Sequence, residues 1–148
     1  MAVHQLLPSF KHGDAMGHAA VAFRALMRRL GHFGDVYAQE VERGWTSLVR
    51  PARELVVKKS DLVLYHHGIA SQLAGLVLHL PCKKGLVFHN VTPARFYPPG
   101  PLAEALTHGR AQMAGMAGLV DVAIGVSQHN ADELTAAGHV NVHRVPLF

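Results

Sequence analysis

The stretch that decides the fold is GLVFHNVTP, residues 85–93. Its first four residues form a short apolar run, which is typical of a parallel strand buried on both faces. The run passes directly into a loop that contains His89 and Asn90. In open α/β sheets, ligands bind outside the carboxyl ends of the strands. The stretch therefore predicts a buried strand that ends in a functional loop, with His89 as the first candidate for chemistry.

Short apolar runs and amphipathic segments alternate along the rest of the chain, with Pro8 expected to end the first run and Asp14 to cap the first helix. This alternation predicts an α/β fold: one Rossmann-like, doubly wound, mainly parallel sheet of about six strands over residues 1–148, with helices on both faces. Strands are expected at residues 2–7, within 34–41, and at 62–65, 85–88, 121–126 and 140–145; helices are expected at 15–30, 69–80, 102–117 and 131–137, with a short helix or turn within 52–59.

Composition narrows the class of protein. Hydrophobic residues make up 49% of the 148 residues and charged residues 16%, a globular balance rather than a disordered one. The net charge of +4 suits a phosphate-bearing partner without requiring one. Aromatic residues are only 7% and do not alternate with Lys or Arg, so no nucleic-acid partner is expected. The single cysteine, Cys82, fits a reducing, cytoplasmic setting.

Four polar clusters follow predicted strands and should meet at one edge of the sheet. Gly13, just before the first helix, would let backbone N–H groups approach an anion, although it could equally be a simple turn residue. Asp14 would repel a phosphate unless its side chain caps the helix. The clusters are residues 11–14, 66–68, 89–90 and 127–128.

The histidines and the serine at this edge each have two interpretations. His89 could act as an acid, a base or a hydrogen-bond donor, or could simply hold the following loop. His66 and His67, expected in a loop, could contact a ligand or pair with backbone carbonyls. Ser127 lacks the surroundings of a hydrolase nucleophile, so it is expected to cap a helix, with Asn130 as a competing cap.

Two further features concern metals and membranes. The chain has twelve histidines, but no His-x-x-x-His or Cys-x-x-Cys pattern, so no metal site is expected. The cluster of Arg24, Arg28 and Arg29 is most simply a solvated helix face, and it would also allow peripheral contact with an anionic membrane.

Four motifs, taken in order, resemble a known family. They are Pro-x-x-x-x-Gly-Asp-Ala at 8–15, YHHGIAS at 65–71, FHNVTPA at 88–94 and Val-Ser-Gln-His-Asn-x-x-Glu-Leu at 126–134. Together they resemble the N-terminal half of bacterial family-four retaining glycosyltransferases, which have the GT-B fold. The resemblance covers essentially the whole chain and implies two Rossmann-like domains that face each other across a cleft.

The resemblance also implies roles for individual residues. His89 would lie beside the transferred sugar, and Ser127 would line the cleft. Gly13 and its loop would approach the donor diphosphate, but many relatives have a second glycine where this chain has Asp14. The residues expected on the acceptor side are His66, His67 and Asn90.

The implied activity needs more than this chain. The family's glutamate pair, which binds the nucleotide-sugar donor in the second domain, has no counterpart here, and the chain ends on the apolar pair Leu147–Phe148. We therefore expect an acceptor-side domain that is inactive alone and needs neither metal nor bound cofactor. Its expected partners are a nucleotide-sugar donor, a sugar or glycolipid acceptor, its own missing C-terminal domain, and other copies through the exposed face.

Two other functions are kept open. A stand-alone, non-catalytic Rossmann-like module could bind a nucleotide, a sugar or a protein. A dinucleotide-dependent oxidoreductase is disfavoured, because no Gly-x-Gly-x-x-Gly follows the first strand.

Overall fold

The computed structural model describes residues 1–146, and it contains a single seven-stranded sheet. The strands are β1 (Val3–Phe10), β2 (Val36–Val41), β3 (Arg50–Pro51), β4 (Leu62–His67), β5 (Lys83–Phe88), β6 (Val122–Gly125) and β7 (Val142–Arg144). The helices are α1 (Ala15–Arg29), α2 (Leu73–Val77), α3 (Pro101–Gly115) and α4 (Gln128–Ala136), with two 3₁₀ turns, η1 (Ala52–Glu54) and η2 (Ala94–Phe96).

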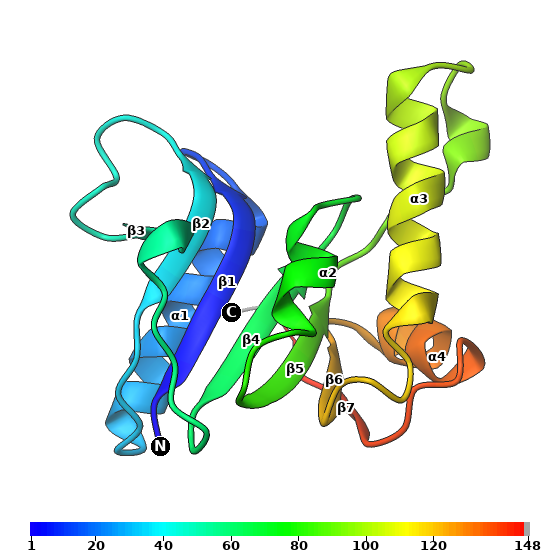
Figure 1. Cartoon of the computed structure of the whole chain (residues 1–148). Coiled ribbons are helices and arrows are strands. Elements are labelled where there is room, and N and C mark those ends of the chain that lie inside the picture. The colour runs from blue at the N-terminus through cyan, green and yellow to red at the C-terminus, as the bar shows by residue number, and fades with distance from the viewer. Residues whose placement is uncertain (147–148) are drawn as a thin grey trace.

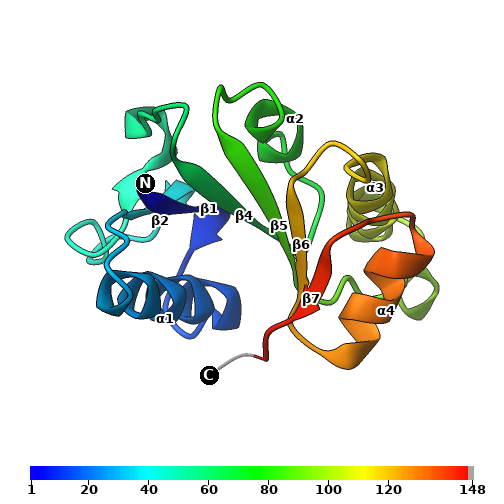
Figure 2. The same cartoon turned by 90° about the horizontal axis from the view of Figure 1, so that it is seen from below.

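All pairings in the sheet are parallel, in the order β3-β2-β1-β4-β5-β6-β7 (Figure 1). The order runs outward from β1 in both directions, which is the doubly wound pattern. Figure 2 shows α1 on one side of the sheet and the other three helices on the opposite side. The predicted fold class is confirmed, and the extra strand is the two-residue β3.

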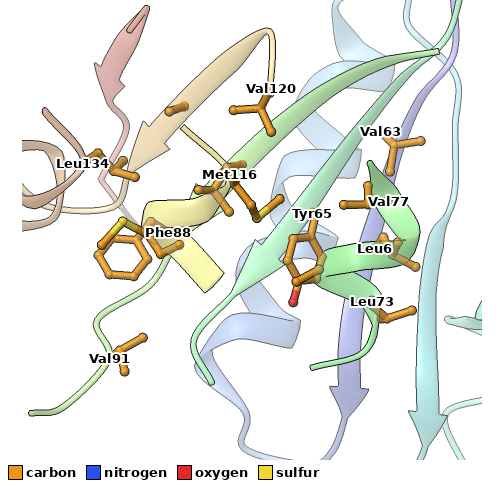
Figure 3. Packing of buried hydrophobic residues seen from close by; sticks show 14 of the residues in the cluster. Leu6, Val63, Tyr65, Leu73, Val77, Phe88, Val91, Met116, Val120 and Leu134 are labelled. Atoms are coloured by element: carbon orange, nitrogen blue, oxygen red, sulfur yellow. The ribbon is translucent and has the colours of Figure 1, made fainter. Parts of the chain in front are cut away.

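The core has a layer on each face of the sheet. The larger layer lies under α2, α3 and α4 and is built from alternate residues of the central strands (Figure 3). The layer under α1 is smaller and includes Val3, Phe23, Leu64 and Val87. Every second residue of a strand faces the same side, so neighbours such as His66 and His67 must enter different layers.

The first helix begins and ends as its sequence predicts. Asp14 is the N-cap, and its Oδ1 accepts a hydrogen bond from Met16 N at 3.1 Å. Gly31, one residue after the C-cap Leu30, has a φ of +86°. A left-handed glycine at this position is a common helix terminator.

Two strand ends lie later than predicted. Pro8 does not end β1, which continues to Phe10. Beyond Leu6, β1 pairs with β2 but no longer with β4, and a proline is tolerated where one side of a strand needs no donor. His66 and His67 are not in a loop, because β4 continues to pair with β5 as far as His67 opposite Phe88.

The second helix is shorter than the predicted 69–80, since α2 covers only Leu73–Val77. The segment before it is tied to α3 instead of forming helix: Gln112 Oε1 accepts from Ser71 N at 3.0 Å, and Gln112 Nε2 donates to Ser71 O at 2.9 Å. No helix within residues 1–146 is long and apolar enough to cross a membrane. The apolar end Leu147–Phe148 lies outside the described residues.

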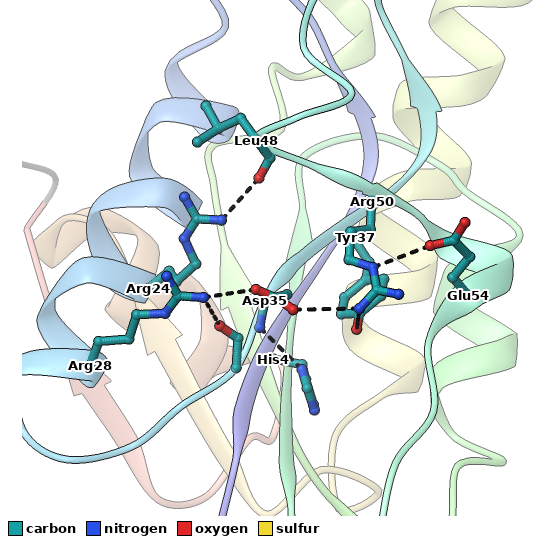
Figure 4. Close-up of polar contacts among 9 residues, drawn as sticks. His4, Arg24, Arg28, Asp35, Tyr37, Leu48, Arg50 and Glu54 are labelled. Carbon is teal, nitrogen blue, oxygen red and sulfur yellow. Dashed lines mark hydrogen bonds and ion pairs between the residues drawn. The ribbon is translucent and has the colours of Figure 1, made fainter.

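Two arginines of α1 hold the segments on either side of β2 (Figure 4). Asp35, directly before β2, lies 2.8 Å from Arg28 Nη2 and 3.6 Å from Arg50 Nη1. Arg24 Nη1 donates to the carbonyl of Leu48 at 2.9 Å. Arg28 and Arg29 are exposed, as expected of a solvated face, and Arg24 is half-buried.

Gly125, the last residue of β6, allows α4 to pack closely against the sheet. A Cβ at this position would lie 2.7 Å from Ala131 Cα and 2.9 Å from the carbonyl carbon of Asn130. Both are backbone atoms, which cannot rotate away as a side chain can. We expect Gly125→Ala to lower the free energy of unfolding by about 1–3 kcal/mol, the usual cost of overpacking. Urea denaturation followed by circular dichroism measures it.

Gly75 is the matched control for this prediction. It lies in α2, and a Cβ there would meet no heavy atom within 4 Å. We expect Gly75→Ala to stabilise the fold by about 0.4–1 kcal/mol, because alanine restricts the unfolded chain. Equal effects of the two substitutions would contradict the assignment of Gly125 as a close-packing contact.

Candidate functional site

A pocket of about 450 Å³ opens at the carboxyl edge of the sheet, between the ends of β1, β4 and β5. It brings together four of the predicted site residues: Gly13, Asp14, His89 and Asn90. The other lining residues follow or end the same strands or begin α1; they are Pro8, Ser9, Lys11, His12, Met16, Gly68 and Ile69. The predicted convergence of strand-end loops is confirmed for β1, β4 and β5.

One wall of the pocket is the turn between β1 and α1. Gly13 has a φ of +74°, a conformation that favours glycine. Asp14 N donates to Lys11 O at 3.2 Å, which closes the turn. The Asp14 carboxylate is engaged by Met16 N as the helix cap, so it is tied up in the way that the sequence required for an anion to approach.

Glu42 and Trp45 support this turn through contacts with His12 that were not predicted from the sequence. His12 N donates to Glu42 Oε2 at 2.8 Å, and Trp45 Nε1 donates to the same oxygen at 3.2 Å. The rings of His12 and Trp45 stack, with centroids 6.0 Å apart. The two supporting residues come from the segment after β2, which showed only a polar, turn-like pattern.

His89 forms the opposite wall. Its backbone N–H donates to His67 O at 2.9 Å, which continues the β4–β5 ladder by one residue and fixes the backbone. The side chain is 8% exposed, and its Nε2 lies 2.9 Å from His66 Nδ1. Burial, assisted by the nearby His67, lowers the pKa of His89 to about 4. The ring is therefore neutral at pH 7.

The structure separates His66 and His67, which are neighbours in the chain. Both are fully buried, and neither lines the pocket. His66 lies behind His89, on the α1 side of the sheet, where Phe23 packs against its ring. His67 enters the opposite layer and donates from Nε2 to Gly109 O of α3 at 2.7 Å. Its contact is the backbone-carbonyl alternative that the sequence left open.

Ser127 acts as the N-cap of α4. Its Oγ accepts from Asn130 N at 3.1 Å and donates to Asn130 Oδ1 at 2.7 Å. The predicted capping role is confirmed, and Asn130 is not the cap. Ser127 is not among the residues that line the pocket. Its role in lining a larger cleft stays a prediction.

Glycine at position 68 keeps the floor of the pocket narrow. A Cβ on Gly68 would lie 2.6 Å from Met16 Cε and 3.7 Å from His89 Cβ. A side chain here would push Met16 away from the β4 loop. The sequence predicted Gly68 in a strand-end loop and Ile69 at the start of a helix, but it did not predict this close contact with Met16.

A larger hollow, of about 620 Å³, lies between η2 and α3. Figure 1 shows this part of α3 projecting beyond the carboxyl edge of the sheet. None of its lining residues directly follows a strand, and none is a buried polar group. The pocket at His89 is therefore the better candidate site, because buried polar side chains stand directly behind it.

The side chains around the pocket offer hydrogen bonds and a positive charge. A neutral imidazole, the Asn90 amide and the Lys11 ammonium lie around it. Within residues 1–146, no group of three His, Cys, Asp or Glu side chains is arranged to hold a metal ion.

No protein-family model matches the sequence, and no curated protein matches it.

Proposed function

We propose that the chain is the acceptor-side, N-terminal domain of a retaining GT-B glycosyltransferase, which transfers a sugar from a nucleotide-sugar to a hydroxyl acceptor. The observation that carries the proposal is the pocket itself. It places a neutral, buried histidine opposite a glycine turn that begins a helix, at the edge where parallel α/β sheets bind ligands. The four ordered motifs support the same function.

The two walls suit the two charges that develop in sugar transfer. The departing diphosphate is negative, and the N-terminal end of α1 offers a dipole and backbone N–H groups beside Gly13. The sugar becomes positively charged, and a neutral imidazole does not repel it. A proton-accepting group at His89 would also contact a sugar hydroxyl directly.

A second domain is part of the proposal. One wall of a cleft cannot exclude water or align two substrates, and both are needed for efficient transfer. The missing donor-binding residues would come from that domain. We therefore expect no turnover by the 148-residue chain alone.

The test uses the protein encoded by the complete reading frame. It is incubated with UDP-, GDP- and ADP-sugars and a panel of sugar and glycolipid acceptors, and release of the nucleoside diphosphate is measured. Acceptor-dependent release supports the proposal, with the 148-residue chain as the inactive control. A reading frame that stops after residue 148, or nucleotide binding without release, would overturn it in favour of a non-catalytic binding module.

A further inference from the structure

Three polar side chains form a buried row behind the pocket. They come from three adjacent strands: Gln5 from β1, His66 from β4 and His89 from the end of β5. His66 Nε2 lies 2.7 Å from Gln5 Oε1, and His66 Nδ1 lies 2.9 Å from His89 Nε2. Gln5 and His66 are fully buried, and only His89 reaches the pocket.

The direction of the hydrogen bonds follows from one atom. The amide oxygen of Gln5 only accepts, so His66 Nε2 must carry the proton. In a neutral ring His66 Nδ1 is then an acceptor, and His89 Nε2 must donate to it. The proton of His89 therefore lies on the side that faces away from the ligand, toward His66.

Both rings are held neutral, so each carries one proton, and the order follows from the Gln5 oxygen that faces His66. Burial, together with the neighbouring His89, keeps the pKa of His66 well below its usual 6.5. Phe23, whose ring centroid lies 6.0 Å from that of His66, carries no charge that could stabilise an imidazolium. Each neutral imidazole in this row carries one proton on one of its two nitrogens. The Gln5 oxygen decides which nitrogen of His66 carries it, and His66 in turn decides which nitrogen of His89 does.

We infer that Gln5, acting through His66, is a positioning residue that holds His89 in its Nε2–H tautomer and leaves Nδ1 as a hydrogen-bond acceptor for the bound ligand. His89 Nδ1 has no hydrogen-bond partner among residues 1–146. Nδ1 lies on the opposite side of the ring from the bond to His66. Gln5 and His66 do not touch the ligand, since neither lines the pocket.

The tautomer decides which chemical group fits against His89. A lone pair at Nδ1 accepts a hydrogen bond from a hydroxyl or amine and repels an acceptor such as a phosphate oxygen. On the proposed function, on which this step alone rests, the group is a sugar hydroxyl. The donor diphosphate would then bind at the other wall, beside Gly13, rather than at His89.

The direct test is long-range ¹H–¹⁵N correlation spectroscopy of the ¹⁵N-labelled 148-residue chain at pH 7. The two rings are assigned by comparison with His66→Gln and His89→Gln. We expect both to be neutral Nε2–H tautomers. An Nδ1–H tautomer at either ring would overturn the inference. This measurement needs no substrate and no variant of Gln5, so it stands whether or not the chain belongs to a transferase.

Two variants of Gln5 test the positioning role. Gln5→Glu places a carboxylate against His66 Nε2, which favours the imidazolium. His66 Nδ1 would then donate as well, so we expect His89 to change to the Nδ1–H tautomer. Gln5→Leu is similar in size but has no acceptor, so we expect His89 to become a mixture of tautomers. If Gln5→Leu left the His89 spectrum unchanged, Gln5 would not be a positioning residue.

Kinetics of the complete reading frame give a second readout. We expect Gln5→Leu to lower kcat about tenfold with less than a twofold change in KM, and Gln5→Glu to lower kcat further, because it would hold His89 in the other tautomer. An unchanged kcat in both variants would contradict the inference. Wild-type protein without any transfer would contradict the proposed function alone, because the spectra decide the tautomer independently.

Discussion

Replacing His89 with alanine should lower kcat/KM for sugar transfer by about 10²-fold or more in the complete protein, with the fold intact. The reason is that the imidazole is the one buried, neutral, proton-accepting side chain that reaches the pocket within the described residues. A positioned acid or base of this kind contributes roughly 10²–10⁴-fold to a reaction. Initial rates of nucleoside diphosphate release measure the loss.

The control for this prediction is His79→Ala. His79 is exposed at the end of α2, lies outside the pocket and donates only to Gly75 O. Both variants remove an imidazole, so loss of activity in His89→Ala alone assigns the effect to the site. Circular dichroism and urea denaturation of each variant show that the chain is folded. Turnover of His89→Ala within threefold of the wild type would remove His89 from the mechanism.

The layout of the sheet was predictable because the central strands β4 and β5 have continuous apolar runs. Residues 85–88 and 62–65 could not be exposed, and their alternation with helical segments allows few topologies. The ends of the strands were harder to predict, because they depend on where the neighbouring strands still pair. Pro8 stays in β1 only because β4 no longer pairs there, and the His66–His67 pair belongs to β4 only because β5 continues beside it.

The sequence predicted where the site lies better than how the buried residues behind it are arranged. The strand-end rule identified the loops at Gly13 and His89. It could not show that His66 lies behind His89 while His67 faces the other layer, because that depends on where β4 ends. Gln5 stood out only as a polar residue in an apolar run, and its partner His66 lies 61 positions away in the sequence.

The same buried histidines should make the fold sensitive to acid. His89 has a pKa of about 4 in the folded chain against 6.5 when exposed, so the unfolded chain binds more protons between these values. Stability therefore falls as the pH drops through this window, since stability rises with pH wherever the unfolded state binds more protons. His89 alone should cost about 2 kcal/mol at pH 5 and about 3 kcal/mol by pH 4.

Three other buried histidines act in the same direction. Burial lowers the pKa of His66 and of His67. It also lowers the pKa of His4, where the smaller effects of Asp61 and Asp35 oppose it. The carboxylate of Asp61, whose pKa is lowered by backbone N–H groups of Lys58 and Ala2, loses its contribution only below about 3.8. Acid unfolding between pH 6 and 4 would therefore come from these histidines and not from Asp61.

The measurement is the free energy of unfolding in urea at pH 7, 6 and 5, compared among three proteins. We expect the wild type to lose several kcal/mol between pH 7 and 5, a large share of the 5–15 kcal/mol that stabilises an ordinary domain. His89→Gln cannot take up the proton, so its loss over the same interval should be about 2 kcal/mol smaller. His18→Gln, at an exposed position on α1, should lose as much as the wild type. Equal stability of the wild type at pH 7 and pH 5 would mean that the row from Gln5 to His89 takes up protons without unfolding, and the neutral tautomers assigned to it would then be wrong.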